Sequence, residues 1–413
     1  MVNEEIRIYG YRWVILAVFM CAVLVNQLLW ITFAPVTGSA AAFYKVSDLS
    51  IGLLSLVFMV VYIFVSIPAS WVIDTFGFRI AVGIGAVLTG VFGLIRGLAA
   101  DNFTWVLIAQ IGIAIGQPFL LNAMTTVAAR WFPIRERAIA SGLGSLAMYL
   151  GIVFGMALTP YMVIHSGLGS TLVSYGIIAI IAAILFLAFA KERPPTPACP
   201  PGQEDRSLVF DGLKNMLRKK DYILLLIIFF FGLGVFNAVA TWIEEIVRPR
   251  GFTIIQAGLT GGLMILGGLA GAVIMSWLSD HYKKRVPFIL LALSASCLGL
   301  VGITFATNYT LLLASSFILG FFLLSAGPIG FQYGAEIAFP APEGTSNGLL
   351  LLMGQISGII FILGMDQFKS AGTGSMTLSL VILVGLLFLS FLIGTKLRES
   401  VLLRGKVEII KDE

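Results

Sequence analysis

Ser70-Trp71-Val72-Ile73-Asp74 returns nearly unchanged as Ser276-Trp277-Leu278-Ser279-Asp280, at an offset of 206 residues in a chain of 413. Each copy ends a long apolar segment and leads into a short basic turn. A sequence echo at a fixed interval indicates an internal repeat. In a strongly apolar chain, this repeat predicts two similar bundles of membrane helices around a central site.

The composition supports membrane helices over the length of the chain. Apolar residues make up 59% of the sequence and charged residues 11%, whereas about a quarter of the residues in a soluble domain are charged. A bilayer core needs roughly 20 apolar residues for each helix. Twelve stretches meet this requirement, and the predicted fold is an all-α protein with two pseudo-symmetric six-helix bundles. The stretches are 12–38, 51–73, 80–99, 104–127, 138–163, 170–190, 221–246, 255–278, 286–306, 309–335, 345–366 and 376–395.

Positive charge is distributed unevenly between the two sides that these stretches define. All but five of the 26 Lys and Arg residues lie on the side of the N-terminus, and the exceptions are Lys45, Arg96, Arg248, Arg250 and Lys369. This asymmetry follows the positive-inside rule. It predicts a multi-pass protein of the plasma (inner) membrane with both termini in the cytoplasm. The net charge of +5 thus reflects basic residues that orient the protein in the lipid bilayer. We expect no nucleic-acid partner.

A linker divides the chain into halves. Residues 194–201 contain five prolines, so this stretch cannot form a regular helix. We predict an N-terminal bundle at 1–190, a cytoplasmic linker at 191–220, a C-terminal bundle at 221–395 and a tail at 396–413. The linker also contains Cys199-Pro200, a pair that could ligate haem through the thiolate. Neither His165 nor His281 lies within an apolar stretch, and we expect no metal and no cofactor.

The turns after the repeated pentapeptide carry chemistry suited to gating. Asp74, Gly77 and Arg79 form the first turn, in which the glycine allows a tight bend. Asp280 and Arg285 take corresponding places in the second. An acid at the end of the second and eighth stretches, followed by a basic turn, resembles the signature loop of the major facilitator superfamily. That resemblance implies a cytoplasmic latch which sets the balance between inward- and outward-facing states.

Few ionisable residues lie inside the predicted spans, and none is central. Arg96 is close enough to the outer end of the third stretch for its side chain to reach the interface. Glu244 and Glu245 end the seventh stretch near Arg248 and Arg250, where we expect interface anchors or ion pairs. A proton-coupled pump usually carries an acid or a histidine near the midplane. Facilitated diffusion by alternating access is therefore favoured over proton coupling.

The central polar residues are neutral. Asn26, Trp30, Phe33 and Thr37 are spaced as a single helical stripe, the fourth stretch carries Gln117 and the eleventh carries Gln355. These amides could bind a ligand, or they could simply join helices through hydrogen bonds worth about 1 kcal/mol each. Tryptophan offers the best cation–π face. An amide-and-aromatic site suits an organic cation or a zwitterion better than a bare anion.

One further stretch carries a specific resemblance. The sequence from Glu336 through Glu343-Gly344-Thr345-Ser346-Asn347 to Gln355 is similar to the junction of helices 10 and 11 in the feline leukaemia virus subgroup C receptor family. Members of that family carry choline and ethanolamine and have been linked to haem export. The resemblance also covers residues 54–63, the span from Gln117 to Trp131-Phe132, and the Asn26–Trp30 spacing. We assign Glu336 and Glu343 to gating together with the two signature turns.

The resemblance also implies a substrate site. Trp30 matches the aromatic wall of the family and Asn26 the amide one turn earlier, while Gln117 and Gln355 match glutamines that face the ligand. The match fails at Asn237, where the family has a tyrosine that completes the cage. Without the tyrosine ring, the binding free energy of a quaternary ammonium is weaker by roughly 0.5–2 kcal/mol. Ethanolamine-like amines, zwitterions and polar neutral metabolites therefore fit as well as choline does.

These observations predict a monomeric membrane transporter for a small polar organic solute. Within the same fold, an alternative is a monocarboxylate or drug porter that uses Arg96 as the anion partner. From another class, the alternative is a receptor or sensor that binds its ligand without moving it. An enzyme is disfavoured because the sequence contains no nucleophile–base pair and no metal-ligand cluster.

Overall fold

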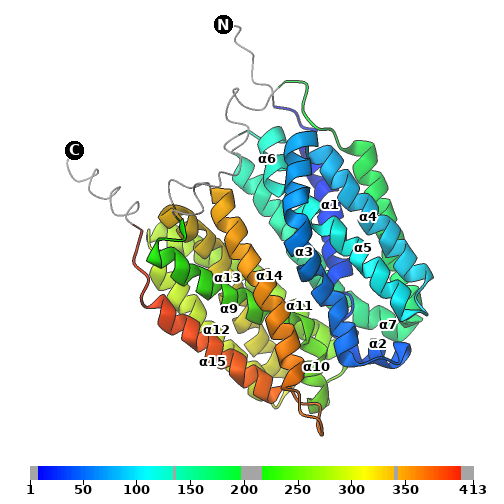
Figure 1. The fold of residues 1–413 in the computed structure, drawn as a ribbon, viewed down its shortest axis with the longest axis vertical. Helices are drawn as coiled ribbons and strands as arrows, with labels where there is room; N and C mark the ends of the chain where they lie inside the picture. Colours follow the sequence, from blue (N-terminus) through cyan, green and yellow to red (C-terminus); the bar gives the residue numbers. More distant parts are fainter. Residues whose placement is uncertain (1–7, 134–135, 197–215, 339–342, 401–413) are drawn as a thin grey trace, which may run out of the picture. The chain divides into compact units, whose positions relative to one another are not determined.

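The computed structural model describes residues 8–133, 136–196, 216–338 and 343–400, and these residues form helices joined by short turns (Figure 1). The chain divides into two compact units, Met1–Arg206 and Ser207–Glu413, which we call unit 1 and unit 2. The boundary falls inside the predicted linker. Each unit packs around its own apolar core, which includes Phe19 and Phe186 in unit 1 and Ile289 and Tyr333 in unit 2.

Unit 1 crosses a membrane thickness six times. Its longest helix, α7, is broken at Gly167, which has φ 79° and ψ 163°. At 1.5 Å per residue, an unbroken helix of this length would far exceed a bilayer core of about 30 Å, so α7 provides two crossings. The elements are α1 (Arg12–Ile31), η1 (Ala34–Val36), α2 (Thr37–Tyr44), α3 (Asp48–Phe76), α4 (Phe78–Leu98), α5 (Phe103–Leu121), α6 (Met124–Trp131) and α7 (Arg137–Phe189).

Unit 2 repeats this arrangement. Helices α3 and α11 begin 206 residues apart, as do α5 and α13, which is the offset of the pentapeptide. With α7 divided at Gly167, the described residues contain twelve helices of membrane length, and the predicted fold class is confirmed. The elements of unit 2 are α9 (Lys220–Thr241), α10 (Ile243–Val247), η3 (Arg248–Arg250), α11 (Ile254–His281), α12 (Val286–Phe305), α13 (Tyr309–Ala338), α14 (Glu343–Gln367) and α15 (Thr377–Gly394).

Polar side chains cap the N-termini of several of these helices. The Ser47 hydroxyl accepts the Ser50 backbone N–H at the start of α3, and the Asn102 side chain accepts two backbone N–H groups at the start of α5. Thr253 and Gln256 form a reciprocal capping box at the start of α11. Each cap satisfies backbone donors that a helix cannot satisfy itself.

The first predicted span is interrupted, so the prediction of one continuous stripe is wrong. Helix α1 ends at Ile31, and a short 3-10 turn carrying Pro35 separates it from α2. Proline has no N–H to donate to the carbonyl four residues earlier. Asn26 and Trp30 therefore lie on α1, whereas Phe33 precedes the 3-10 turn and Thr37 begins α2.

Small residues let helices within each unit approach closely. A Cβ added to Gly151 of α7 would overlap the carbonyl oxygen of Leu24 on α1, and one added to Gly267 of α11 would lie 2.6 Å from the carbonyl oxygen of Phe317 on α13. Gly155 and Gly271 continue these two contacts one turn along. Close backbone contact is a main source of helix association in lipid, because lipid removes the hydrophobic driving force.

We expect Gly271→Ala to lower thermal stability. The new Cβ would overlap the backbone carbonyl of Phe321, and separating α11 from α13 should cost about 1–3 kcal/mol. The measurement is the melting temperature of the purified protein in detergent. Gly385→Ala in α15 is the matched control, because a Cβ there meets no atom within 4 Å. Equal melting temperatures for the two variants would contradict the close contact.

Candidate substrate site and gating loops

Asn26 is enclosed within unit 1. Its side chain is 0% exposed, and its amide nitrogen donates to Thr89 Oγ1 at 3.0 Å and to the carbonyl of Ile113 at 3.4 Å. Its oxygen accepts from Gln27 Nε2 at 3.4 Å. The amide thus joins α1 to α4 and α5. This is the interhelical hydrogen bonding that the sequence left open as an alternative to ligand binding.

Trp30 lies one turn further along α1 and is held by α3. Its side chain is 7% exposed, and the indole Nε1 donates to the carbonyl of Ser55 at 3.2 Å. The hydrogen bond fixes the edge of the ring that carries the N–H. The aromatic face is therefore presented in one orientation, as an amphipathic ring with a satisfied polar edge usually is.

Each of the two predicted glutamines is at the middle of a span in its own unit. Gln117 is the midpoint of the span Phe103–Trp131, and Gln355 is the midpoint of α14. Gln117 is buried and Gln355 is half-buried, and neither side-chain amide makes a hydrogen bond to the residues that the structure describes. An amide in hydrocarbon costs free energy unless it is paired. Within each unit, one amide at the middle of a span is thus left without a protein partner among the described residues.

Asn237 lies beside Gln355 within unit 2. Its amide nitrogen donates to the carbonyl of Gly354 at 3.2 Å, so α9 is tied to α14 at the residue that precedes Gln355. The structure thus brings two of the predicted site residues together in unit 2. Asn237 is largely buried, and its carbonyl oxygen stays available as an acceptor.

Arg96 does not reach the interface, and the prediction that its side chain extends there is wrong. The side chain is 0% exposed, and its Nη1 donates to the carbonyl of Leu29 at 2.9 Å and to Gln110 Oε1 at 2.8 Å. Its guanidinium carbon lies 5.5 Å from the centroid of the Phe33 ring. The partners of Nη1 lie inside unit 1 rather than in solvent, while Nε and Nη2 make no hydrogen bond within the described part of the chain.

The two acids at the end of the seventh span form ion pairs, as expected. Glu245 lies 2.6 Å from Arg248 and 2.5 Å from Lys369, and Glu244 lies 3.4 Å from Arg248. The Lys369 contact joins α10 to the loop that follows α14. Burial lowers the pKa of the nearby Arg250 guanidinium, which donates to the carbonyl of Ile303. These charges organise one end of unit 2.

Three of the predicted gating residues meet in unit 2. Arg285 contacts the Asp280 carboxylate, and its Nε donates to Glu336 Oε1 at 3.2 Å. Its Nη1 also donates to Ser279 Oγ at 3.1 Å. Arg285 is buried, Glu336 nearly so and Asp280 mainly exposed. We call these four residues the Arg285 cluster. The Glu343 side chain lies outside the described residues.

The corresponding turn in unit 1 is built differently. Asp74 and Arg79 are exposed, and Gly77 has a positive φ of 87° between α3 and α4. The position 206 residues before Glu336 is occupied by Arg130, which cannot pair with Arg79. Arg130 instead lies 2.9 Å from Glu192. At this repeat position the two units therefore carry opposite charges.

A pair of carboxylates was missed by the sequence reasoning. The Glu192 side chain accepts the backbone N–H groups of Phe78 and Arg79 at the start of α4, at 3.2 and 2.7 Å. The Glu399 side chain accepts those of Arg285 and Val286 at the start of α12, at 3.0–3.2 Å. A carboxylate at a helix N-terminus is favourable. The signal was present, because a basic residue followed by glutamate comes shortly after the last span of each half, at Lys191-Glu192 and Arg398-Glu399.

Two other polar groups carried no clear sequence signal. Gln110 joins Arg96 to the backbones of α1 and α3. Asn122 accepts from Tyr62 at 2.9 Å and donates to Ser66 and Ser70. Single glutamines, asparagines and serines are common in membrane helices, and only tertiary contacts reveal which of them form networks.

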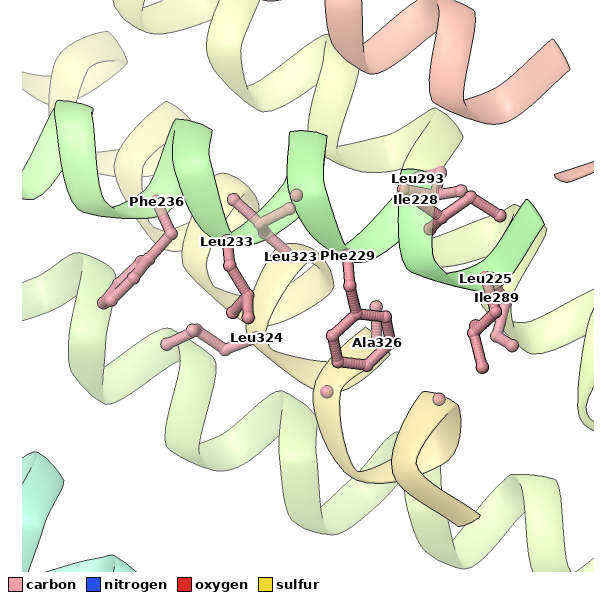
Figure 2. A pocket seen from close by; sticks show the side chains of 13 residues that line it. Leu225, Ile228, Phe229, Leu233, Phe236, Ile289, Leu293, Leu323, Leu324 and Ala326 are labelled. Atoms are coloured by element: carbon pink, nitrogen blue, oxygen red, sulfur yellow. The ribbon is translucent and has the colours of Figure 1, made fainter. Parts of the chain in front are cut away.

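A small cavity lies within unit 2 between α9, α12 and α13 (Figure 2). Its volume is about 30 Å³, which is more than one water molecule needs, and apolar side chains and glycines line it. Phe236 lies at one end, close to Asn237 in the chain, and Phe229 and Leu324 line the middle. Such a lining offers no hydrogen bond to a polar solute.

Comparisons with known proteins agree with this architecture. The family model of the Major Facilitator Superfamily matches residues 15–362. Solute carrier family 49 member A3 of Xenopus tropicalis is 32% identical over 377 residues, covering 87% of this chain and 78% of the relative. The Felis catus protein named choline/ethanolamine transporter FLVCR1 is 28% identical over 415 residues, covering 94% and 73%. The resemblance to that receptor family is thus confirmed.

A solved structure shows the same fold. The bacterial homologue of the human lysosomal transporter Spinster, in an inward-facing and unoccupied conformation, superposes with a TM-score of 0.76 at 17% identity. The match covers 94% of this chain and 98% of the other. Together with the family match over most of the sequence, this establishes that the chain belongs to the major facilitator superfamily of membrane transporters.

Proposed function

We propose that this transporter moves a small polar organic solute, a choline- or ethanolamine-like cation or a zwitterion, by facilitated alternating access. The observation that carries the proposal is the pair of midspan glutamines, Gln117 and Gln355, whose amides lack partners among the described residues. Transporter sites lie near the bilayer midplane. Neutral amides at this depth suit a solute that both donates and accepts hydrogen bonds.

The charge pattern of the spans supports the facilitated mode. In the described spans, with α7 divided at Gly167, no Asp, Glu, His, Lys or Arg lies in the central turns. Proton relays in transporters are built from such residues. The named activity of the FLVCR1 relative, choline and ethanolamine transport, is consistent with the proposed substrate class.

We assign roles as follows. Trp30 supplies the aromatic face, and Gln117, Gln355 and Asn237 supply hydrogen bonds. Asn26 supports the site from within unit 1, because its amide nitrogen is already bonded to Thr89 and Ile113. Gating is assigned to the two signature turns and the junction before α14, namely Asp74, Gly77, Arg79, Asp280, Arg285, Glu336 and Glu343. The protein works as a monomer in the plasma membrane with both termini cytoplasmic.

Uptake into proteoliposomes tests the proposal. We expect radiolabelled choline or ethanolamine to equilibrate with the vesicle interior, and unlabelled solute to compete. With the membrane potential held at zero, an imposed proton gradient should leave the final level of choline unchanged, since facilitated diffusion only equalises the electrochemical potential of the solute. If neither solute is carried nor competes with binding, the cation proposal fails. Saturable binding without uptake would instead favour a receptor.

A further inference from the structure

The backbone of α1 next to Trp30 is held by two side chains from other helices. The Leu29 carbonyl accepts from Arg96 Nη1 of α4 at 2.9 Å and from Gln110 Nε2 of α5 at 3.5 Å. Arg96 and Gln110 are themselves joined at 2.8 Å. Leu29 lies in the last turn of α1, where carbonyls lack intrahelical donors. A cation at this helix end also interacts favourably with the helix dipole.

The same glutamine holds the helix that contacts Trp30. Gln110 Nε2 donates to the carbonyl of Leu54 on α3 at 3.1 Å. The next residue on α3, Ser55, provides the carbonyl that accepts from the Trp30 indole at 3.2 Å. Arg96 and Gln110 therefore hold two neighbouring residues of α1 close to two neighbouring residues of α3. The residues are Leu29 and Trp30 on α1 and Leu54 and Ser55 on α3. Trp30 lies within this closed set of contacts.

The charge of Arg96 argues against a role in stability alone. The side chain is fully buried, and no carboxylate lies within ion-pair distance of it among the described residues. Its Nε and Nη2 make no hydrogen bond within the described part of the chain. Unpaired buried donors are costly, and an apolar side chain of similar volume often stabilises a protein better than a buried charge does. Energetically unfavourable groups of this kind, which lower the stability of the fold locally, are found mainly at functional sites.

We propose that Arg96 and Gln110 are positioning residues that fix the depth and orientation of the Trp30 indole. The proposal rests on the proposed function insofar as Trp30 faces the solute. Arg96 acts through the backbone of Leu29, because Nη1 already bonds to that carbonyl and the side chain is enclosed. Gln110 acts on both helices at once. Loosening either contact should let α1 shift at its C-terminal end, just before the break that contains Pro35.

Hydrogen exchange of the purified protein tests the positioning without any solute. In Arg96→Met and Gln110→Met, peptides covering residues 28–36 should exchange about tenfold faster, as expected from losing one charge-assisted or amide hydrogen bond. Arg96→Lys should exchange more slowly than Arg96→Met. Arg250→Met is the matched control, because Arg250 also donates to a carbonyl near a helix end, that of Ile303, but in unit 2. Unchanged exchange at residues 28–36 would overturn the proposal.

Transport kinetics then separate positioning from the other possible roles. We expect Arg96→Met to raise the KM of the carried solute more than it lowers the maximal rate, with a melting temperature equal to or above that of the wild type. A lower melting temperature with an unchanged KM would overturn the proposal in favour of a structural role. Lost uptake with unchanged exchange would overturn it in favour of direct ligand binding. If no amine is carried at all, the proposed function fails while the exchange result still decides the positioning.

Discussion

Arg285→Gln should destabilise unit 2 by about 3 kcal/mol, because breaking a buried ion pair leaves an uncompensated charge. The charge left behind is Glu336, which would keep only the hydrogen bond from Gln332 at 3.2 Å. The Glu336 side chain is 10% exposed, whereas Asp280 is 66% exposed. Asp280 can return to water and contributes little. The melting temperature in detergent measures the effect, which should amount to several degrees.

The repeat supplies a matched control for Arg285. Arg79 stands at the same place in unit 1, but its side chain is exposed, so Arg79→Gln should change the melting temperature little. The double variant Arg285→Gln/Glu336→Gln should recover most of the loss, since it removes the stranded carboxylate. A single variant as stable as the wild type, or a double variant worse than the single, would show that the Arg285–Glu336 pair does not stabilise the turn.

Trp30→Ala should weaken solute binding about tenfold to thirtyfold. The estimate corresponds to a cation–π interaction of up to about 2 kcal/mol in a desolvated site. Trp30 is the aromatic ring that the hydrogen bond to Ser55 holds in place, and it lies on α1 near the middle of the span Arg12–Tyr44. Equilibrium binding of choline and ethanolamine, normalised to folded protein, is the measurement.

Two further variants keep this prediction decisive if the alanine variant folds poorly. Trp30→Phe retains an aromatic face and should bind within about threefold of the wild type, since cation–π attraction persists with phenylalanine. Trp30→Leu retains apolar volume without a π face. If binding is lost in Trp30→Leu and retained in Trp30→Phe, the ring at this position binds the solute through a cation–π interaction. Wild-type binding in all three would exclude Trp30 from the site.

The sequence alone predicted the architecture, because the forces that determine it are local. Apolar length specifies a membrane helix without reference to neighbours, and the echo between residues 70–74 and 276–280 revealed the duplication. The charges of the Arg285 cluster were also recognisable, because two of them lie in one turn.

The site was less predictable, because a residue type does not say which way a side chain points. Asn26 was expected to face a ligand together with Trp30, yet its amide is spent on Thr89 and Ile113. A four-residue spacing places two side chains on one face but does not identify what that face meets. The same holds for Arg96, whose position near a helix end was compatible with either the interface or the interior.

What the sequence by itself determined is therefore the number of helices, their repeat and the chemistry available in the gating turns. Only the tertiary structure decided that Arg96 and Gln110 close around Leu29, and that Glu192 and Glu399 cap helices in two differently charged turns. The reason is physical. Hydrophobic length acts along the chain, whereas a buried polar group must find a partner wherever packing supplies one.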